Sequence, residues 1–271
     1  MKIVFLGGGN MATALIGGML ATGFEREAIT VIEREREAGA RLAERFGVGV
    51  VGGVAEAGLP ADALVLAVKP QQMKAALADF DGRLDDTLVV SIAAGLRAAD
   101  IVRWLGGHRR LVRCMPNTPA LIGAGITGLF ADPSVDGDGR ALAERLLQAV
   151  GATVWVDDEA AIDAVTAISG SGPAYVFHFI EALEAAGGAL GFDAATARKL
   201  AIDTVLGAAR LAAESDEAPA TLRERVTSKG GTTAAALEVM RQRDLMGLVA
   251  AATHAAEQRG RELGVELGRE A

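Results

Sequence analysis

The sequence predicts an α/β domain followed by an all-helical domain. Short apolar segments with strand character alternate with helical segments through the first 159 residues, and strand character disappears after about residue 160. The length of 271 residues corresponds to about two domains. We therefore expect one domain at residues 1–159 and a second at residues 160–271. The alternation in the first predicts a parallel sheet that is covered on both faces.

The composition excludes several classes of protein. The formal net charge is −8, with acids and bases interspersed, which argues against nucleic acid or an anionic membrane surface as a partner. The single cysteine, Cys114, excludes an internal disulfide, and no Cys/His cluster predicts a metal site. The first residues lack the layout of a signal peptide, and no uncharged apolar run reaches about 18 residues. We expect a soluble cytoplasmic protein.

The first predicted strand leads directly into a glycine-rich turn. Residues 2–6 are apolar, and Gly7, Gly9 and Ala12 then fit the spacing G-x-G-x-x-[G/A] ahead of an apolar helix that extends to about Leu20. The first glycine permits the turn, the second lets the backbone approach a diphosphate, and the small third residue lets the helix pack on the strand. This pattern predicts a dinucleotide site with contacts from Gly7, Gly9, Asn10, Met11 and Ala12.

The end of the second predicted strand, residues 29–33, carries two opposing signals. Glu33 lies about 20 residues after the glycines, where a carboxylate accepts hydrogen bonds from the ribose of NAD. Arg34 and Arg36 follow, and arginine at this position holds the 2′-phosphate of NADP. A solvated charged start of a surface helix is the alternative interpretation.

Further strands are predicted at residues 48–51, 63–68, 87–94 and 110–115. Ligands of parallel sheets bind at the carboxyl ends of the strands. Small residues and prolines stand at these ends and leave space for a nicotinamide ring, although Lys69 is also compatible with an ordinary surface lysine. The predicted cofactor contacts at these ends are Ala67, Val68, Lys69, Pro70, Ala93, Ala94 and Asn117.

The second half reads as helical after two weak strands at residues 126–130 and 153–156. The predicted helices are 160–168, 173–186, 194–215, 219–226, 232–243 and 245–264. Ser169-Gly170-Ser171-Gly172-Pro173 predicts a break between the first two, because serine suits a cap and proline suits a first helical turn. A helical domain this apolar predicts burial against another subunit, so we expect a homodimer at least.

A run of glycines and hydroxyl residues, Thr227-Ser228-Lys229-Gly230-Gly231-Thr232-Thr233, precedes one of these helices. A turn of this kind presents unpaired backbone N–H groups at the positive end of a helix dipole, and the hydroxyl groups add further donors. The run predicts a socket for a small anion such as a carboxylate. An ordinary helix cap after a flexible loop is the alternative.

Together these segments resemble the pyrroline-5-carboxylate reductase family. The matching pieces span the chain in order and are Gly7–Ala12, residues 67–71, Arg113–Pro119, residues 169–175 and Val226–Thr233. Two positions differ from the family pattern, with Lys229 replacing the usual proline and Glu33 replacing a small polar residue.

The resemblance implies a Rossmann-type dinucleotide-binding domain and a helical domain for substrate binding and dimerisation, with dimers that assemble further into decamers. It implies reduction of the cyclic imine 1-pyrroline-5-carboxylate to L-proline, with NADPH preferred and NAD possible. The implied substrate contacts are Ser228, Gly230, Gly231, Thr232 and Thr233. Thr233 is placed against the ring nitrogen as the catalytic residue.

Three alternatives stay open. A β-hydroxyacid dehydrogenase would need a base to take the hydroxyl proton, and the helix after Gly172 has no lysine before Lys199 and no asparagine. Another imine reductase would share the C=N chemistry. A regulatory protein that binds NAD(P) without turnover is the third.

Overall fold

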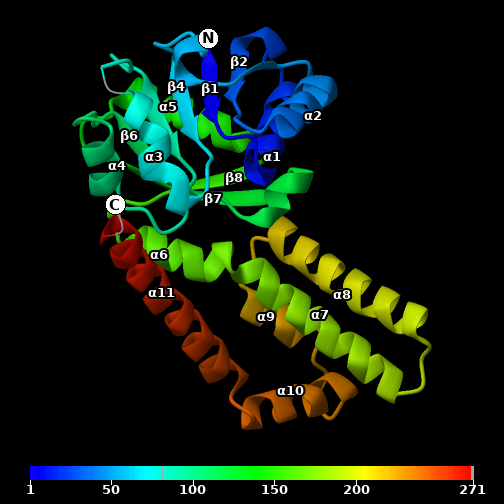
Figure 1. Cartoon of the computed structure of the whole chain (residues 1–271). Helices are drawn as coiled ribbons and strands as arrows, with labels where there is room; N and C mark the ends of the chain where they lie inside the picture. Colours follow the sequence, from blue (N-terminus) through cyan, green and yellow to red (C-terminus); the bar gives the residue numbers. More distant parts are fainter. Residues whose placement is uncertain (81, 270–271) are drawn as a thin grey trace. The chain divides into compact units, whose positions relative to one another are not determined.

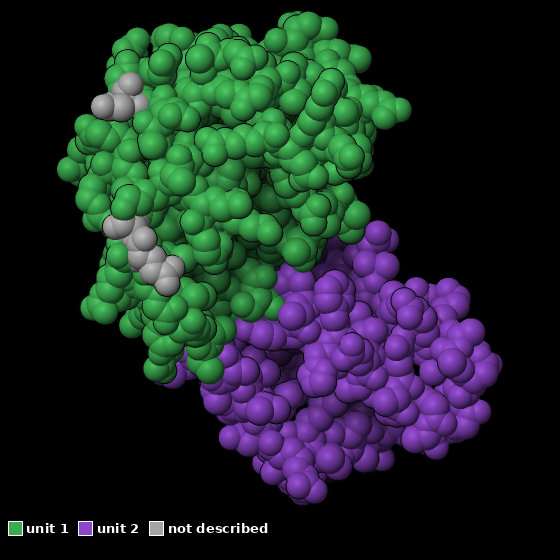
Figure 2. All heavy atoms as spheres, viewed as in Figure 1, with its two compact units in different colours: residues 1–171, 255–271 green, residues 172–254 purple. Residues whose placement is uncertain are grey.

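The computed structural model describes residues 1–80 and 82–269 and divides into two compact units (Figures 1 and 2). The first unit is Met1–Ser171 together with the segment from Ala255, and the second is Gly172–His254. This division differs from the predicted boundary at 159–160, because residues 160–171 and the C-terminal segment pack with the first unit.

A single sheet forms the centre of the first unit. Within the described residues it has eight strands in the order β3-β2-β1-β4-β5-β6-β7-β8. The order reverses between β1 and β4, so the carboxyl ends of these two strands flank the crevice where such sheets bind ligands. The strands are β1 (Ile3–Leu6), β2 (Ile29–Ile32), β3 (Gly49–Val51), β4 (Ala63–Leu66), β5 (Leu88–Ser91), β6 (Leu111–Met115), β7 (Gly125–Ala131) and β8 (Gly151–Trp155).

The predicted parallel pairing is confirmed from β1 to β6, whereas β7, which the sequence indicated only weakly, runs antiparallel to β6. The connection between them is residues 116–124, which hold only the short 3-10 helix Thr118–Ile122. A parallel return needs a crossover of a dozen or more residues, so this connection permits only an antiparallel pair. The longer connection through α5 (Gly137–Gln148) restores parallel pairing between β7 and β8.

Helices cover both faces of the sheet, as the apolar strands predicted. Successive residues of β1 enter different cores, with Ile3 and Phe5 on one side and Val4 and Leu6 on the other. Helices α1 (Asn10–Ala21), α2 (Arg36–Phe46) and α5 supply residues to the first core. Helices α3 (Met73–Leu77) and α4 (Ala98–Trp104) supply residues to the second. This packing buries the central strands on both faces and leaves their carboxyl ends as the place for a ligand.

The break predicted at residues 169–173 is instead a local change of helix type. Helix α6 (Ala161–Val165) continues as a π-helix at Thr166–Gly170, and the backbone of Ser171 is still helical before α7 (Gly172–Ala189) begins. The hydroxyl of Ser169 donates to the carbonyl of Val165 at 2.9 Å and so does not cap the next helix. The wider π turn accommodates the extra residue, a geometry that is frequent at functional sites.

The second unit consists of helices with almost no buried side chains of its own. It contains α7, α8 (Ala194–Glu214), α9 (Pro219–Arg225), α10 (Thr232–Gln242) and the first part of α11 (Leu245–Arg269). Its buried apolar residues are Ala197 and Ala201, counted over the part of the chain that is described. Phe177 and Leu190, in contrast, are 61% and 80% exposed. No helix among the described residues is both long and apolar enough to cross a membrane.

Candidate functional site

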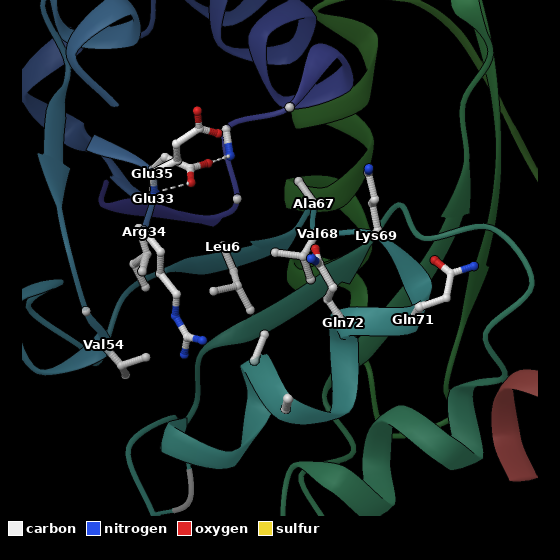
Figure 3. Close-up of a pocket in the computed structure, with 17 residues that line it drawn as sticks. Leu6, Glu33, Arg34, Glu35, Val54, Ala67, Val68, Lys69, Gln71 and Gln72 are labelled. Atoms are coloured by element: carbon white, nitrogen blue, oxygen red, sulfur yellow. Dashed lines mark hydrogen bonds between the residues drawn. The ribbon is translucent and has the colours of Figure 1, made fainter. Parts of the chain in front are cut away.

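A cavity of about 630 Å³ lies at the carboxyl ends of β1, β2 and β4, at the point where the strand order reverses (Figure 3). Its size falls within the range of small-molecule and cofactor sites. Seven of the predicted cofactor residues line it, namely Gly7, Gly9, Glu33, Arg34, Ala67, Val68 and Lys69. The cavity is therefore the place where these separate sequence segments come together.

The glycine-rich turn leaves free backbone donors beside this cavity. Gly7 has φ of +97°, and a Cβ at this residue would lie 2.8 Å from a methyl carbon of Val68, so only glycine lets β1 turn against the end of β4. No side chain caps α1 at Gly9, and no acidic residue stands in its first turn. The N–H groups at the start of α1, from Asn10 to Ala12, thus remain available for a diphosphate.

The carboxylate of Glu33 is tied to this turn. Its Oε2 accepts a hydrogen bond from the N–H of Gly8 at 2.9 Å, and its Oε1 accepts one from the N–H of Glu35 at 2.9 Å (Figure 3). A Cβ on Gly8 would lie 2.3 Å from Leu42 and 3.2 Å from Glu33, so the close approach requires glycine. The carboxylate is therefore held at the cavity rim in one orientation.

Arg34 extends to the other side of the cavity rim from Glu33 (Figure 3). Its guanidinium lies 3.6 Å from a carboxylate oxygen of Asp79, and both side chains are mostly exposed, so the pair holds Arg34 only weakly. Gln71 and Gln72 enter the cavity from the segment that follows β4. The sequence analysis did not predict the remaining lining residues, which are Leu6, Gly8, Ile32, Glu35, Gly53, Val54, Gln71, Gln72, Ala75 and Ala76.

Eight predicted cofactor residues do not line this cavity. Asn10, Met11 and Ala12 belong to the first turn of α1, and buried Ala12 packs in the core beneath it. The other five are Arg36, the exposed first residue of α2; Pro70, which opens a 3-10 helix; Ala93 and Ala94, which follow β5; and Asn117, which follows β6. The last three stand further along the same edge of the sheet.

Asn117 already uses both ends of its amide inside the protein. Its Oδ1 accepts from the N–H of Ile126 at 3.0 Å, and its Nδ2 donates to the carbonyl of Ser169 at 3.1 Å. These bonds join the turn after β6 to the π-helix. The local sequence did not indicate this because Ser169 lies 52 residues further along the chain.

A buried ionic cluster supports the same end of β6. Arg113, 1% exposed, lies 2.8 Å from Glu159 and 3.7 Å from Asp163, and Arg97 lies 2.7 Å from Asp163. Burial lowers the pKa of Arg113, and the neighbouring Glu159 carboxylate opposes that shift. A Cβ on Gly264 would lie 2.9 Å from Nε of Arg97, so α11 approaches the cluster closely at a glycine. The cluster links the start of α4 and helix α6 to the sheet, and α11 packs against it at Gly264.

Cys114, next to this cluster on β6, is buried, and its burial raises the pKa of the thiol. The group is therefore protonated and acts as a small apolar side chain. Across the described residues, no set of three or more His, Cys, Asp or Glu side chains is placed to hold a metal ion.

The hydroxyl-rich run lies in the second unit, at the start of α10. Ser228 to Gly231 form a hydrogen-bonded turn in which Gly230 has φ of +73°. No side chain caps α10. Among the described residues, no hydrogen bond engages the hydroxyl groups of Ser228, Thr232 or Thr233. Within the described residues, three hydroxyl groups and a helix N-terminus thus form a set of donors without a hydrogen-bond partner in the protein.

The structure corrects one detail of the predicted socket. The N–H of Gly231 is not free, because it donates to the carbonyl of Ser228 at 3.0 Å. Gly231 has a steric role, since a Cβ at this residue would lie 2.4 Å from Oγ of Ser228. The available backbone donors are those of Gly230 and of the first turn of α10, beginning at Thr232.

Comparisons with known proteins match both parts of the chain. A family model described as "Pyrroline-5-carboxylate reductase dimerisation" matches residues 159–263, and one described as "NADP oxidoreductase coenzyme F420-dependent" matches residues 2–95. The chain is 47% identical to a pyrroline-5-carboxylate reductase of Pseudomonas aeruginosa, with 98% of each protein covered. It is 37% identical to that of Escherichia coli, covering 92% of this chain and 93% of the relative.

Solved structures agree over nearly the whole chain. A pyrroline-5-carboxylate reductase from Coxiella burnetii has a TM-score of 0.92 at 43% identity, covering 97% of this chain and 98% of that one. The Plasmodium falciparum pyrroline carboxylate reductase, solved with NADP bound, has a TM-score of 0.84 at 26% identity, again covering 97% and 98%.

Proposed function

This chain belongs to the pyrroline-5-carboxylate reductase family, and we propose that its first unit binds the nicotinamide cofactor while the loop before α10 binds the imine substrate. The reaction is the reduction of 1-pyrroline-5-carboxylate to L-proline with a hydride from NAD(P)H. The residue roles below are the proposal, and the unengaged donors at the start of α10 are the observation that carries it.

The substrate has a carboxylate, and the start of α10 suits that group. We assign the carboxylate to the hydroxyl of Ser228 and to the N–H groups of Gly230 and Thr232. Each of these donors is free of a partner among the described residues, so binding breaks no internal hydrogen bond. The positive end of the helix dipole favours an anion at this position. Gly231 supports the socket by letting Ser228 lie against the backbone.

Thr233 lies one residue further along the first turn of α10, with its hydroxyl uncommitted. We place this hydroxyl at the ring nitrogen, where it hydrogen-bonds the iminium N–H or the amine that replaces it. When bound, the reduced nicotinamide supplies the hydride to the C=N carbon. A protonated imine is already electrophilic, so orientation by the socket can supply most of the rate effect, which for well-placed reactants is about 7–11 kcal/mol.

The cavity in the first unit fits the cofactor. Its glycine turn has no space for a Cβ at Gly7 or Gly8, and free N–H groups stand at the start of α1 for the diphosphate. We propose NADPH as the donor, with the guanidinium of Arg34 on the 2′-phosphate, because this side chain reaches the cavity and is only weakly paired with Asp79. Arg36 does not line the cavity, so we assign the 2′-phosphate to Arg34 first and to Arg36 second.

The exposed apolar side chains of the second unit support a homodimer. Phe177, Leu211 and Met246 are 61%, 57% and 82% exposed, and a helical unit with so few buried residues gains its core by association. The family resemblance extends the proposal to decamers that are assembled from dimers. A cytoplasmic location stays a prediction.

A direct assay tests the proposed roles. NADPH oxidation is followed with pyrroline-5-carboxylate, and NADP reduction with β-hydroxyacids. We expect turnover with the imine alone, and failure on the imine despite cofactor binding would reject the assignment of the substrate site.

A variant pair then tests Thr233. Thr233→Ala should lower kcat/KM for the imine by about 10-fold or more, the effect of losing a hydrogen bond to a charged group, with little change in the Kd of NADPH. Thr253→Ala is the matched control, since that hydroxyl bonds to carbonyls of its own helix. A wild-type rate for Thr233→Ala would remove this residue from the mechanism.

A further inference from the structure

Of the acidic side chains that line the cavity in the described part of the chain, Glu33 alone has both carboxylate oxygens bonded to backbone N–H groups. The backbone N–H of Glu33 donates to the carbonyl of Val51 at 3.0 Å. Hydrogen bonds therefore hold both the backbone and the side chain of Glu33 in place. Moving the carboxylate aside would break its hydrogen bonds to Gly8 and Glu35. The negative charge therefore remains at this place when a ligand enters the cavity.

Each carboxylate oxygen retains acceptor capacity after these bonds. An ionised carboxylate has about four acceptor sites, of which the N–H groups of Gly8 and Glu35 use two. A ribose hydroxyl can donate to one of the others. A 2′-phosphate carries a charge of about −1.5 to −2 at pH 7 and no comparable donor, so the fixed carboxylate repels it.

Glu33 and Arg34 are neighbours in sequence, and their charges favour different nucleotides. Figure 3 shows their side chains directed to different sides of the rim, with Glu33 toward the glycine turn and Arg34 into the cavity. Arg34 favours the phosphate of NADPH, while Glu33 favours the ribose hydroxyls of NADH. The guanidinium is held loosely by Asp79, whereas the carboxylate is held firmly.

We infer that Glu33 is a specificity-determining residue that makes NADH a working hydride donor for this chain, alongside NADPH held by Arg34. The inference rests on the proposed function of the cavity as the cofactor site. It deepens that proposal by assigning each nucleotide to its own side chain.

The test measures the Kd of NADH and of NADPH by quenching of protein fluorescence, and kcat/KM for both donors with pyrroline-5-carboxylate. The variants are Glu33→Ser and Arg34→Ala. Glu37→Ser is the matched control, because it removes the same charge from the exposed first turn of α2, at a residue that does not line the cavity. Thermal melting of each variant reports whether the glycine turn is intact.

We expect wild-type protein to bind and use both donors. In Glu33→Ser the Kd of NADH should rise by about 10-fold or more, the effect of losing a hydrogen bond to a charged group, while the Kd of NADPH falls. Arg34→Ala should weaken NADPH alone, and Glu37→Ser should leave the ratio of the two Kd values unchanged.

Two results would overturn the inference. Equal weakening of both nucleotides in Glu33→Ser would show that the residue only supports the turn, and no change in either would remove it from the site. Failure of the proposed function has a different signature, in which wild-type protein binds both nucleotides but does not reduce the imine.

Discussion

The two units of this chain reach stability in different ways. The first unit buries its strands on both faces and places a charged cluster around Arg113 inside the protein. The second unit buries little more than Ala197 and Ala201 among the described residues and exposes Phe177, Leu190 and Met246. The comparison indicates that the first unit contains its own core, whereas the second needs a core completed by another copy of the chain.

The largest expected effect comes from a variant that prevents the second unit from associating with another copy. Phe177→Glu places a charge on a side chain that is 61% exposed within one chain, so it costs a single copy little but opposes burial between copies. We expect monomers at micromolar concentration, measured by analytical ultracentrifugation. We also expect loss of activity, measured as NADPH oxidation with pyrroline-5-carboxylate. Glu181→Gln on the same helix is the control. An unchanged dimer in Phe177→Glu would place the interface elsewhere.

The next effect concerns the buried charges of the first unit. Arg113→Ala leaves Glu159 and Asp163 without their buried partner, and breaking a buried pair from one side costs about 3–5 kcal/mol. The free energy of unfolding in urea measures it. Lys199→Ala, which removes an exposed pair with Asp203 in the second unit, should change little. Similar losses in both variants would contradict the contrast between the units.

A smaller effect depends on pH and also lies in the first unit. Burial alone would raise the pKa of Asp132, but hydrogen bonds from the N–H of Ser134 and from Arg109 outweigh it, so the pKa is lowered. The carboxylate therefore stabilises the fold above the unfolded pKa of about 3.9, and this contribution is lost as pH falls through the folded pKa.

Asp132→Asn tests this dependence. We expect a loss of about 1.5–3 kcal/mol at pH 7, the range for a hydrogen bond to a charged group. The difference from wild type should shrink below pH 4, as measured by urea unfolding at several pH values. A difference that is constant with pH would mean that the charge of Asp132 is not involved.

The smallest expected effect concerns the geometry of the loop before α10, which we propose binds the substrate. Lys229 and Gly230 are the central residues of the turn, and Gly230 has the positive φ that a type II turn requires at its second central position. Proline suits the first central position, so Lys229→Pro should stabilise the protein by about 0.4–1 kcal/mol. Thermal unfolding measures the change. Destabilisation would show that Lys229 makes contacts that proline cannot replace.

Several features were predictable because their signals are local. The strand before Gly7, the turn and α1 follow from consecutive residues, and so does the N-terminus of α10 after the glycines. The sequence also predicted that Ser228 and Thr233 supply hydroxyl groups at this helix start. The occupied N–H of Gly231 was not, because it depends on how the turn closes.

What the sequence alone determined is the order of elements, the dinucleotide turn and the family. Repeating apolar patterns and fixed glycine spacings carry that information within a few residues. Only the tertiary structure decided the antiparallel β7, the fixed carboxylate of Glu33, the internal bonds of Asn117 and the charge cluster of Arg113. The partners in the last three lie 25, 52 and 46 residues apart, so no local pattern records them, and they exist only once the chain has folded.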